Sequence, residues 1–162
     1  MISSKQLVAL VAVSMVAMAI LAFTLSAGKT DAATLRPDDA DIVSRGQKVY
    51  AANCASCHGQ QLEGQPNWRI RDQEGYLPAP PHDATGHSWH HSDEQLFELT
   101  KYGLVGLAGA DYKTRMPAYE GILSDEDLVA VLSFIKSRWP ESIRKRHDRL
   151  NAAANRAAGS RR

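Results

Sequence analysis

One short motif constrains this chain more than any other feature. Cys54 and Cys57 are the only two cysteines among 162 residues, and His58 follows the second one directly. This spacing is the attachment pattern of a c-type haem, in which each thiol bonds one haem vinyl group and the histidine binds the iron as its proximal ligand. A redox dithiol would be expected beside a βαβ pattern, and a zinc site would need a second pair of cysteines. Because the sequence has neither, we expect one covalently attached haem c.

The charge of the chain changes sign towards its C-terminus. Residues 34–140 contain 10 Lys/Arg and 15 Asp/Glu, a net charge of −5, whereas residues 141–162 contain 7 basic and 2 acidic residues, a net charge of +5. The length fits one small domain with extensions. We expect this domain at residues 40–140, after a polar linker at 30–39. The basic tail at 141–162 has no sustained apolar face, which indicates a frayed helix or a flexible, disordered segment.

Residues 1–29 have the pattern of a membrane-targeting segment. Lys5 precedes an apolar run from Leu7 to Leu25, and the run is interrupted only by a serine and a threonine. Its 19 residues are many for the core of a signal peptide and close to the roughly 20 needed to span a bilayer. Because the small-residue cleavage signals are poor, we favour an uncleaved N-terminal anchor over a cleaved signal peptide. Either segment would export the domain, and the lysine on the leading side favours a cytoplasmic N-terminus.

Three further segments are predicted to be helices. Residues 40–53 have aspartates at their start that can cap a helix, and Gly46 lies on their apolar stripe. A glycine inside a helix usually marks close packing, so a crossing helix is expected there. Residues 92–102 begin with a serine–glutamine capping box, and residues 124–139 combine a serine cap with an apolar stripe. The last helix is expected to cross the first near Gly46.

A long segment after the haem motif is predicted to be a loop. Residues 59–81 are rich in Gly, Pro, Gln and Asn, which excludes a long helix or a central strand. A proline carbonyl in this loop is expected to accept the proton of the second ring nitrogen of His58 and so fix the imidazole. Pro80 is slightly favoured over Pro66, although either proline can simply stiffen the loop. Four residues are expected in the haem pocket or the core: Trp68, Tyr76, Leu77 and Trp89.

Residues 82–91 contain four of the six histidines, namely His82, His87, His90 and His91. Imidazoles bind copper and zinc, so a second metal site is one interpretation. Against it, His90 and His91 are adjacent, and a polar loop that faces haem propionates or solvent needs no second metal. We favour the polar loop.

Met116 is the only methionine outside residues 1–29. Methionines in a core are usually interchangeable packing residues. This one, however, ends a glycine-containing loop, stands directly before Pro117 and lies 58 residues beyond His58. We expect its thioether to be the second axial ligand, which would stabilise reduced iron relative to a second imidazole.

Together these features resemble a class I cytochrome c of the bacterial, membrane-attached or periplasmic kind. The resemblance covers residues 40–140 and has three matches: Cys54, Cys57 and His58 after a helix with Gly46 and Tyr50; Met116 before Pro117; and the final helix at 127–135. It implies an all-α fold in which helices pack around one covalently attached haem, here with an N-terminal hydrophobic helix in addition. It also implies a single-electron carrier between redox partner proteins. Residues 78–91 are not part of the general family pattern.

From this resemblance we expect a location in the bacterial inner membrane, with the haem domain facing the periplasm. A soluble periplasmic protein would follow if the signal were cleaved. An iron held by two protein ligands has no open position for a substrate, so no enzymatic activity is expected, and no nucleic-acid partner. Two alternatives stay open. The domain could belong to a sensor or a larger oxidoreductase, with Met116 labile, or to a copper-handling protein that uses residues 82–91.

Overall fold

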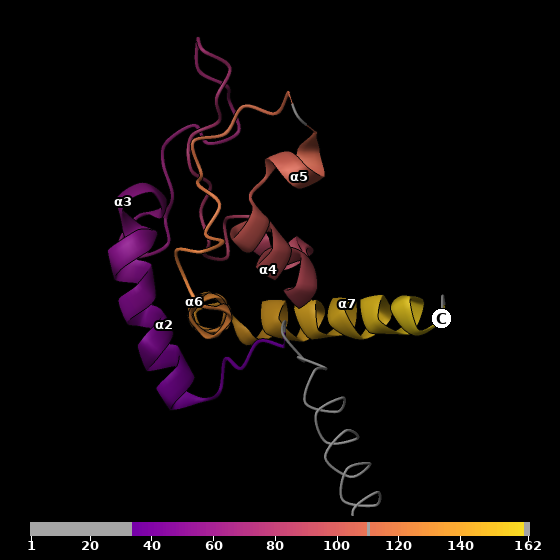
Figure 1. Cartoon of the computed structure of the whole chain (residues 1–162). Coiled ribbons are helices and arrows are strands. Elements are labelled where there is room, and N and C mark those ends of the chain that lie inside the picture. Colours follow the sequence, from indigo (N-terminus) through magenta and orange to yellow (C-terminus); the bar gives the residue numbers. More distant parts are fainter. Residues whose placement is uncertain (1–33, 110, 161–162) are drawn as a thin grey trace, which may run out of the picture. The chain divides into compact units, whose positions relative to one another are not determined.

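The computed structural model describes residues 34–109 and 111–160, and this part of the chain contains helices and loops but no strand (Figure 1). Its helices are α2 (Ala40–Asn53), α3 (Ala55–His58), the 3-10 helix η1 (Ser88–His90), α4 (Asp93–Tyr102), α5 (Val105–Ala108), α6 (Asp125–Ser137) and α7 (Glu141–Gly159). The predicted all-α fold is confirmed for these residues.

The predicted N-terminal hydrophobic helix at residues 1–29 lies outside the described residues. Within them, none of the helices combines the length and the apolar character needed to cross a bilayer.

Side-chain caps determine where the predicted helices begin. The Asp39 carboxylate accepts a hydrogen bond from the Ile42 amide and so starts α2. Ser92 and Gln95 form both hydrogen bonds of a capping box at the start of α4. That helix ends at Gly103, whose φ of 84° favours glycine. Ser124 caps α6 through the amide of Asp127. The predicted helix bounds are therefore confirmed to within two residues.

The core forms where α2 crosses α6 (Figure 1). Every residue of α6 from Leu128 to Lys136 is buried, so this helix is the centre of the fold. Gly46 of α2 lies against the backbone of Ala130, which confirms the predicted crossing point. One turn further along α2, the Tyr50 ring packs 5.5 Å from the Phe134 ring, centroid to centroid. This crossing positions the C-terminal end of α2, which leads directly into the haem motif.

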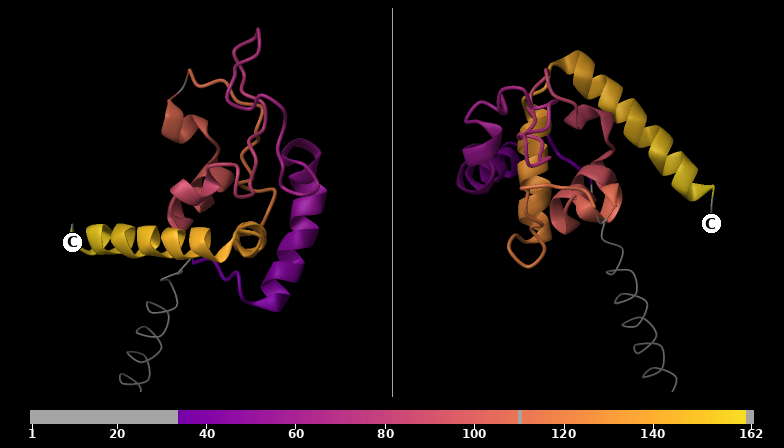
Figure 2. Two further views of the ribbon diagram at one scale, coloured as in Figure 1. Left: turned by 180° about the vertical axis from the view of Figure 1, so that it is seen from behind. Right: turned by 90° about the horizontal axis from the view of Figure 1, so that it is seen from above.

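Helix α7 occupies most of the segment 141–162, for which the sequence indicates either a frayed helix or a flexible segment. Residues 141–159 form one helix, which begins beside α6 and extends away from α2 (Figures 1 and 2). Its first half packs against η1 and the start of α4 through the fully buried His147. The Nε2 nitrogen of His147 donates to the His91 carbonyl over 2.8 Å. The α7 sequence lacks a sustained apolar face because its contact with η1 and the start of α4 is made by polar groups.

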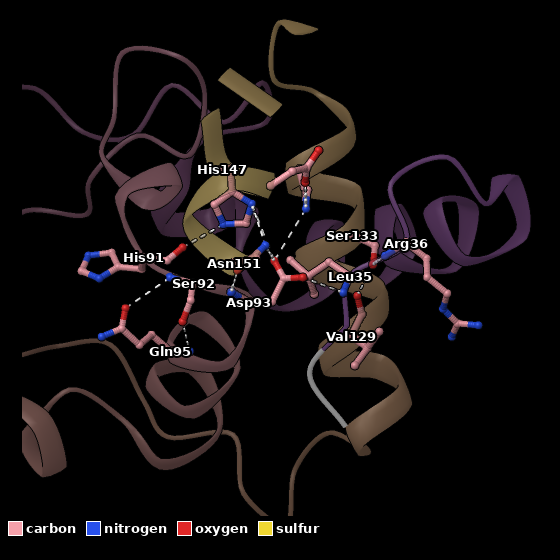
Figure 3. A network of polar contacts seen from close by, with 12 residues as sticks. Leu35, Arg36, His91, Ser92, Asp93, Gln95, Val129, Ser133, His147 and Asn151 are labelled. Atoms are coloured by element: carbon pink, nitrogen blue, oxygen red, sulfur yellow. Dashed lines mark hydrogen bonds and ion pairs between the residues drawn. The ribbon is translucent and has the colours of Figure 1, made fainter. Parts of the chain in front are cut away.

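Asp93, the first residue of α4, connects that helix with α6, α7 and the segment before α2 (Figure 3). Its carboxylate accepts hydrogen bonds from the Leu35 amide at 3.0 Å and from the Asn151 side chain at 2.9 Å. Its own amide donates to the Asn151 side-chain oxygen over 2.8 Å. The nearly buried ammonium of Lys136 lies 3.7 Å away and pairs with Asp148 at 2.8 Å. The start of the domain, α4, α6 and α7 are thereby connected.

His147 is neutral in this network. Burial and the nearby Lys136 ammonium lower its pKa below the ordinary value, and they outweigh the opposite effect of Asp93. The 3.6 Å approach of its Nδ1 nitrogen to Asp93 is therefore not an ion pair.

Candidate functional site

The haem motif forms a single helical turn at the end of α2. The Cys54 amide still bonds to the Tyr50 carbonyl of α2, at 2.9 Å, while the Cys54 carbonyl accepts the His58 amide of α3, also at 2.9 Å. The Tyr50 hydroxyl crosses to the other side of the turn and donates to the Gly59 carbonyl over 2.9 Å. Helix α2 therefore restrains the motif at both of its ends.

The ring of His58 is buried and has one defined orientation. Its Nδ1 nitrogen lies 2.8 Å from the Pro80 carbonyl oxygen. Because a carbonyl only accepts, Nδ1 carries the proton and Nε2 is the nitrogen available to a metal. Burial lowers the pKa of His58, against the smaller opposite effect of this hydrogen bond, so the ring is neutral as a ligand requires. Of the two prolines that the sequence offers, Pro80 makes the contact.

The two thiols have the state that thioether bonds to a haem require. Neither cysteine forms a disulfide; Cys54 is half-buried and Cys57 is exposed. Burial raises the pKa of the Cys54 thiol to about 11, so it is protonated at neutral pH. Two separate thiols beside an oriented, neutral imidazole on one turn fit a covalently bound haem.

Met116 lies in a segment that is attached to this motif. Its side chain is half-buried and packs against the core. Three residues later, the buried Tyr119 donates its hydroxyl proton to the Asn53 carbonyl, next to Cys54, over 2.7 Å. No sequence motif had indicated a role for Tyr119. Ligation of iron by Met116 stays a prediction.

The Met116 segment is also bound to the tip of the loop at residues 59–81. The Arg115 guanidinium donates to Asp72 at 2.7 Å and to Glu74 at 2.9 Å, and it lies 4.0 Å from the centre of the Tyr76 ring. The two segments run side by side in all three ribbon views (Figures 1 and 2). The hydrogen bond from Arg115 holds the pKa of Asp72 below its usual value. We refer to these contacts as the Arg115 clasp; no local sequence pattern predicts them.

The four histidines of residues 82–91 contact aromatic or imidazole rings. His82 stacks on His58, His87 stacks on Trp68, His90 stacks on Trp89, and His91 meets the edge of His87. No group of three or more His, Cys, Asp or Glu in the described part of the chain could hold a metal ion. The described residues thus provide no geometry for the separate copper site considered from the sequence.

The four residues expected in the haem pocket or the core, Trp68, Tyr76, Leu77 and Trp89, are all half-buried. Among them, Trp89 packs against the core cluster. The Arg69 guanidinium lies 4.0 Å from the Trp68 ring centre, so this ring contacts both a cation and the His87 imidazole.

The model of the family described as Cytochrome c matches residues 43–139, more than half of the chain. The chain therefore belongs to the cytochrome c family, as the sequence resemblance predicted. No solved structure matches the chain. Membership implies a covalently bound haem c, electron transfer through it, and redox partner proteins.

Proposed function

We propose that this protein is a single-electron carrier in which His58 and Met116 hold the iron of one haem c. The observation that carries this proposal is the shared support of the two residues. The Pro80 carbonyl fixes His58, and Tyr119 binds the segment of Met116 to the last residue of α2, directly before the turn that contains both cysteines. Donors that are fixed relative to one another suit an iron that keeps its ligands in both redox states.

When bound, the haem supplies a one-electron couple, so no substrate bond has to be made or broken. The chain contributes restraint. The bond to Pro80 prevents rotation of the His58 ring, and the Arg115 clasp limits movement of the Met116 segment. Little rearrangement on oxidation or reduction favours fast electron transfer. With both His58 and Met116 bound to it, the iron would have no free position for a substrate, which supports a carrier rather than an enzyme.

The test is the optical spectrum of the purified full chain together with Met116→Leu, which keeps the apolar volume and removes the sulfur. We expect a far-red charge-transfer band in the oxidised parent and its loss in the variant, which should also bind carbon monoxide when reduced. Ile122→Leu is the matched control, because that side chain lies in the same segment and is 64% exposed. A parent without the band, or one that binds carbon monoxide at neutral pH, would favour a sensor or catalytic haem domain.

We further propose that residues 1–29 anchor the protein in the bacterial inner membrane, with the haem domain in the periplasm. The apolar run from Leu7 to Leu25, with Lys5 before it, supports this location. The intact mass of the protein from membranes should then include the N-terminal residues, and alkaline carbonate should not extract it. A shorter mature chain in the soluble periplasmic fraction would instead support a cleaved signal.

A further inference from the structure

The residue that faces the expected iron ligand is itself a histidine. The ring of His82 lies over the ring of His58 with 4.1 Å between centroids and 24° between planes. It comes two residues after Pro80, whose carbonyl binds the edge of the same ring. One short segment therefore contacts His58 both at its edge and on its face.

His82 is held firmly in this position. Its amide donates to the Leu62 carbonyl over 2.8 Å, and its carbonyl accepts the indole proton of the buried Trp139 at 2.7 Å. Its Nδ1 nitrogen and the hydroxyl of the buried Ser88 are hydrogen-bonded at 2.7 Å. Hydrogen bonds thus fix both the backbone and the ring of His82, unlike those of a loosely packed loop residue.

The other three histidines of the segment lack this contact. His87 and His90 are exposed, and their rings stack on the tryptophans Trp68 and Trp89. The His91 ring meets only the edge of His87 among the described ring contacts. The structure thereby separates His82 from three neighbours that the sequence treats alike.

We propose that His82 is a positioning residue for the iron ligand: its stacked ring fixes the plane of the His58 imidazole and adds a polar group beside it, which lowers the midpoint potential of the haem. The inference rests on the proposed role of His58. Groups around an axial ligand control its orientation and basicity, and a polar environment stabilises the oxidised, more positively charged iron.

The test compares four variants of the full haem-loaded chain by midpoint potential and by the electron paramagnetic resonance of the oxidised protein, which reports the orientation of the ligand planes. His82→Phe keeps a flat ring and removes its polar atoms, so the potential should rise while the resonance stays close to that of the parent. His82→Leu removes the flat ring as well, so both readouts should change. Ser88→Ala releases the imidazole and should shift the potential less than His82→Phe does. His90→Phe is the control and should leave both readouts unchanged.

Parental potentials and resonances in all of the His82 and Ser88 variants would overturn the inference. Should either His82 variant fail to take up haem, Ser88→Ala keeps the test decisive, because it replaces no imidazole or aromatic side chain and removes only the hydrogen bond to His82. The parent spectrum tests the proposed function separately: a parent without haem, or without histidine ligation, contradicts the role of His58 itself. If the parent has histidine-ligated haem and the variants keep its potential and resonance, only the role of His82 is contradicted.

Discussion

Gly46 of α2 and Ala130 of α6 are in backbone contact: a β-carbon at Gly46 would overlap the Ala130 carbonyl. No rotation of a side chain can relieve that overlap, since the obstructing atoms belong to the backbone of the central helix. The approach of these two helices therefore depends on a residue without a side chain.

Gly46→Ala should consequently lower the free energy of unfolding. Overpacking of this kind costs about 1–3 kcal/mol, which exceeds the gain of roughly 0.5–1 kcal/mol from the better helix propensity of alanine. Urea denaturation of the haem-loaded protein measures the difference. The control is Gly106→Ala in α5, where an added β-carbon meets nothing within 4 Å. That variant should be neutral or slightly more stable, and equal losses in both variants would contradict the packing explanation.

Arg115→Gln should loosen the Met116 segment without unfolding the domain. The substitution removes both ion pairs of the Arg115 clasp, yet their partners are exposed and lie outside the core. We expect the far-red band to disappear at a lower temperature than in the parent, while the main unfolding transition moves little. Arg45→Gln removes a comparable surface ion pair between α2 and α6 and should leave the band unaffected. A band equally stable in all three proteins would show that the clasp does not restrain the ligand segment.

Acid should destabilise the contact between α7 and the domain through His147. The folded pKa of this histidine lies below the unfolded value of about 6.5, so the unfolded chain binds more protons. The contribution of His147 to the free energy of unfolding is thus complete above pH 6.5. It is lost as the pH falls from there through the pKa that this histidine has in the folded protein. Denaturation measured from pH 8 to pH 5 should show stability falling below about pH 6.5.

His147→Gln should reduce this dependence on pH, because glutamine does not titrate and can still donate to the His91 carbonyl. His90→Gln is the control, since the His90 side chain is exposed. An undiminished loss of stability in His147→Gln would assign the acid effect to other groups.

Asn151→Ala should release part of α7. The Asn151 side chain both accepts from the Asp93 amide and donates to the Asp93 carboxylate, so its removal leaves a partly buried amide without its partner. We expect a loss of about 1–2 kcal/mol in the free energy of unfolding and faster proteolysis within α7. Asn155→Ala, one helical turn later and exposed, carries the same change in helix propensity. Similar behaviour of the two variants would show that the asparagine contact contributes nothing specific.

Local signals predicted much of the fold and of the candidate site. The caps at Asp39, Ser92 and Ser124 each act over three residues, and the motif from Cys54 to His58 lies within one helical turn. Chemistry that is confined to so few neighbouring residues can be read from their order alone.

Contacts between segments far apart in the chain were harder to predict from the sequence. The pairing of Asp93 with Asn151 joins residues 58 positions apart through polar groups, so hydrophobic periodicity gives no sign of it. The sequence therefore left a frayed helix and a flexible segment equally open for residues 141–162. The Arg115 clasp is likewise made by charged side chains in loops.

The order of residues alone determined the family, the attachment motif with its histidine, and the helices that pack around it, because capping, periodicity and motif spacing act over short distances. Tertiary structure decided which proline binds His58, which of four similar histidines faces that ring, and how the basic C-terminal helix packs. These three outcomes depend on polar contacts between segments that are brought together only when α2, α4, α6 and α7 pack.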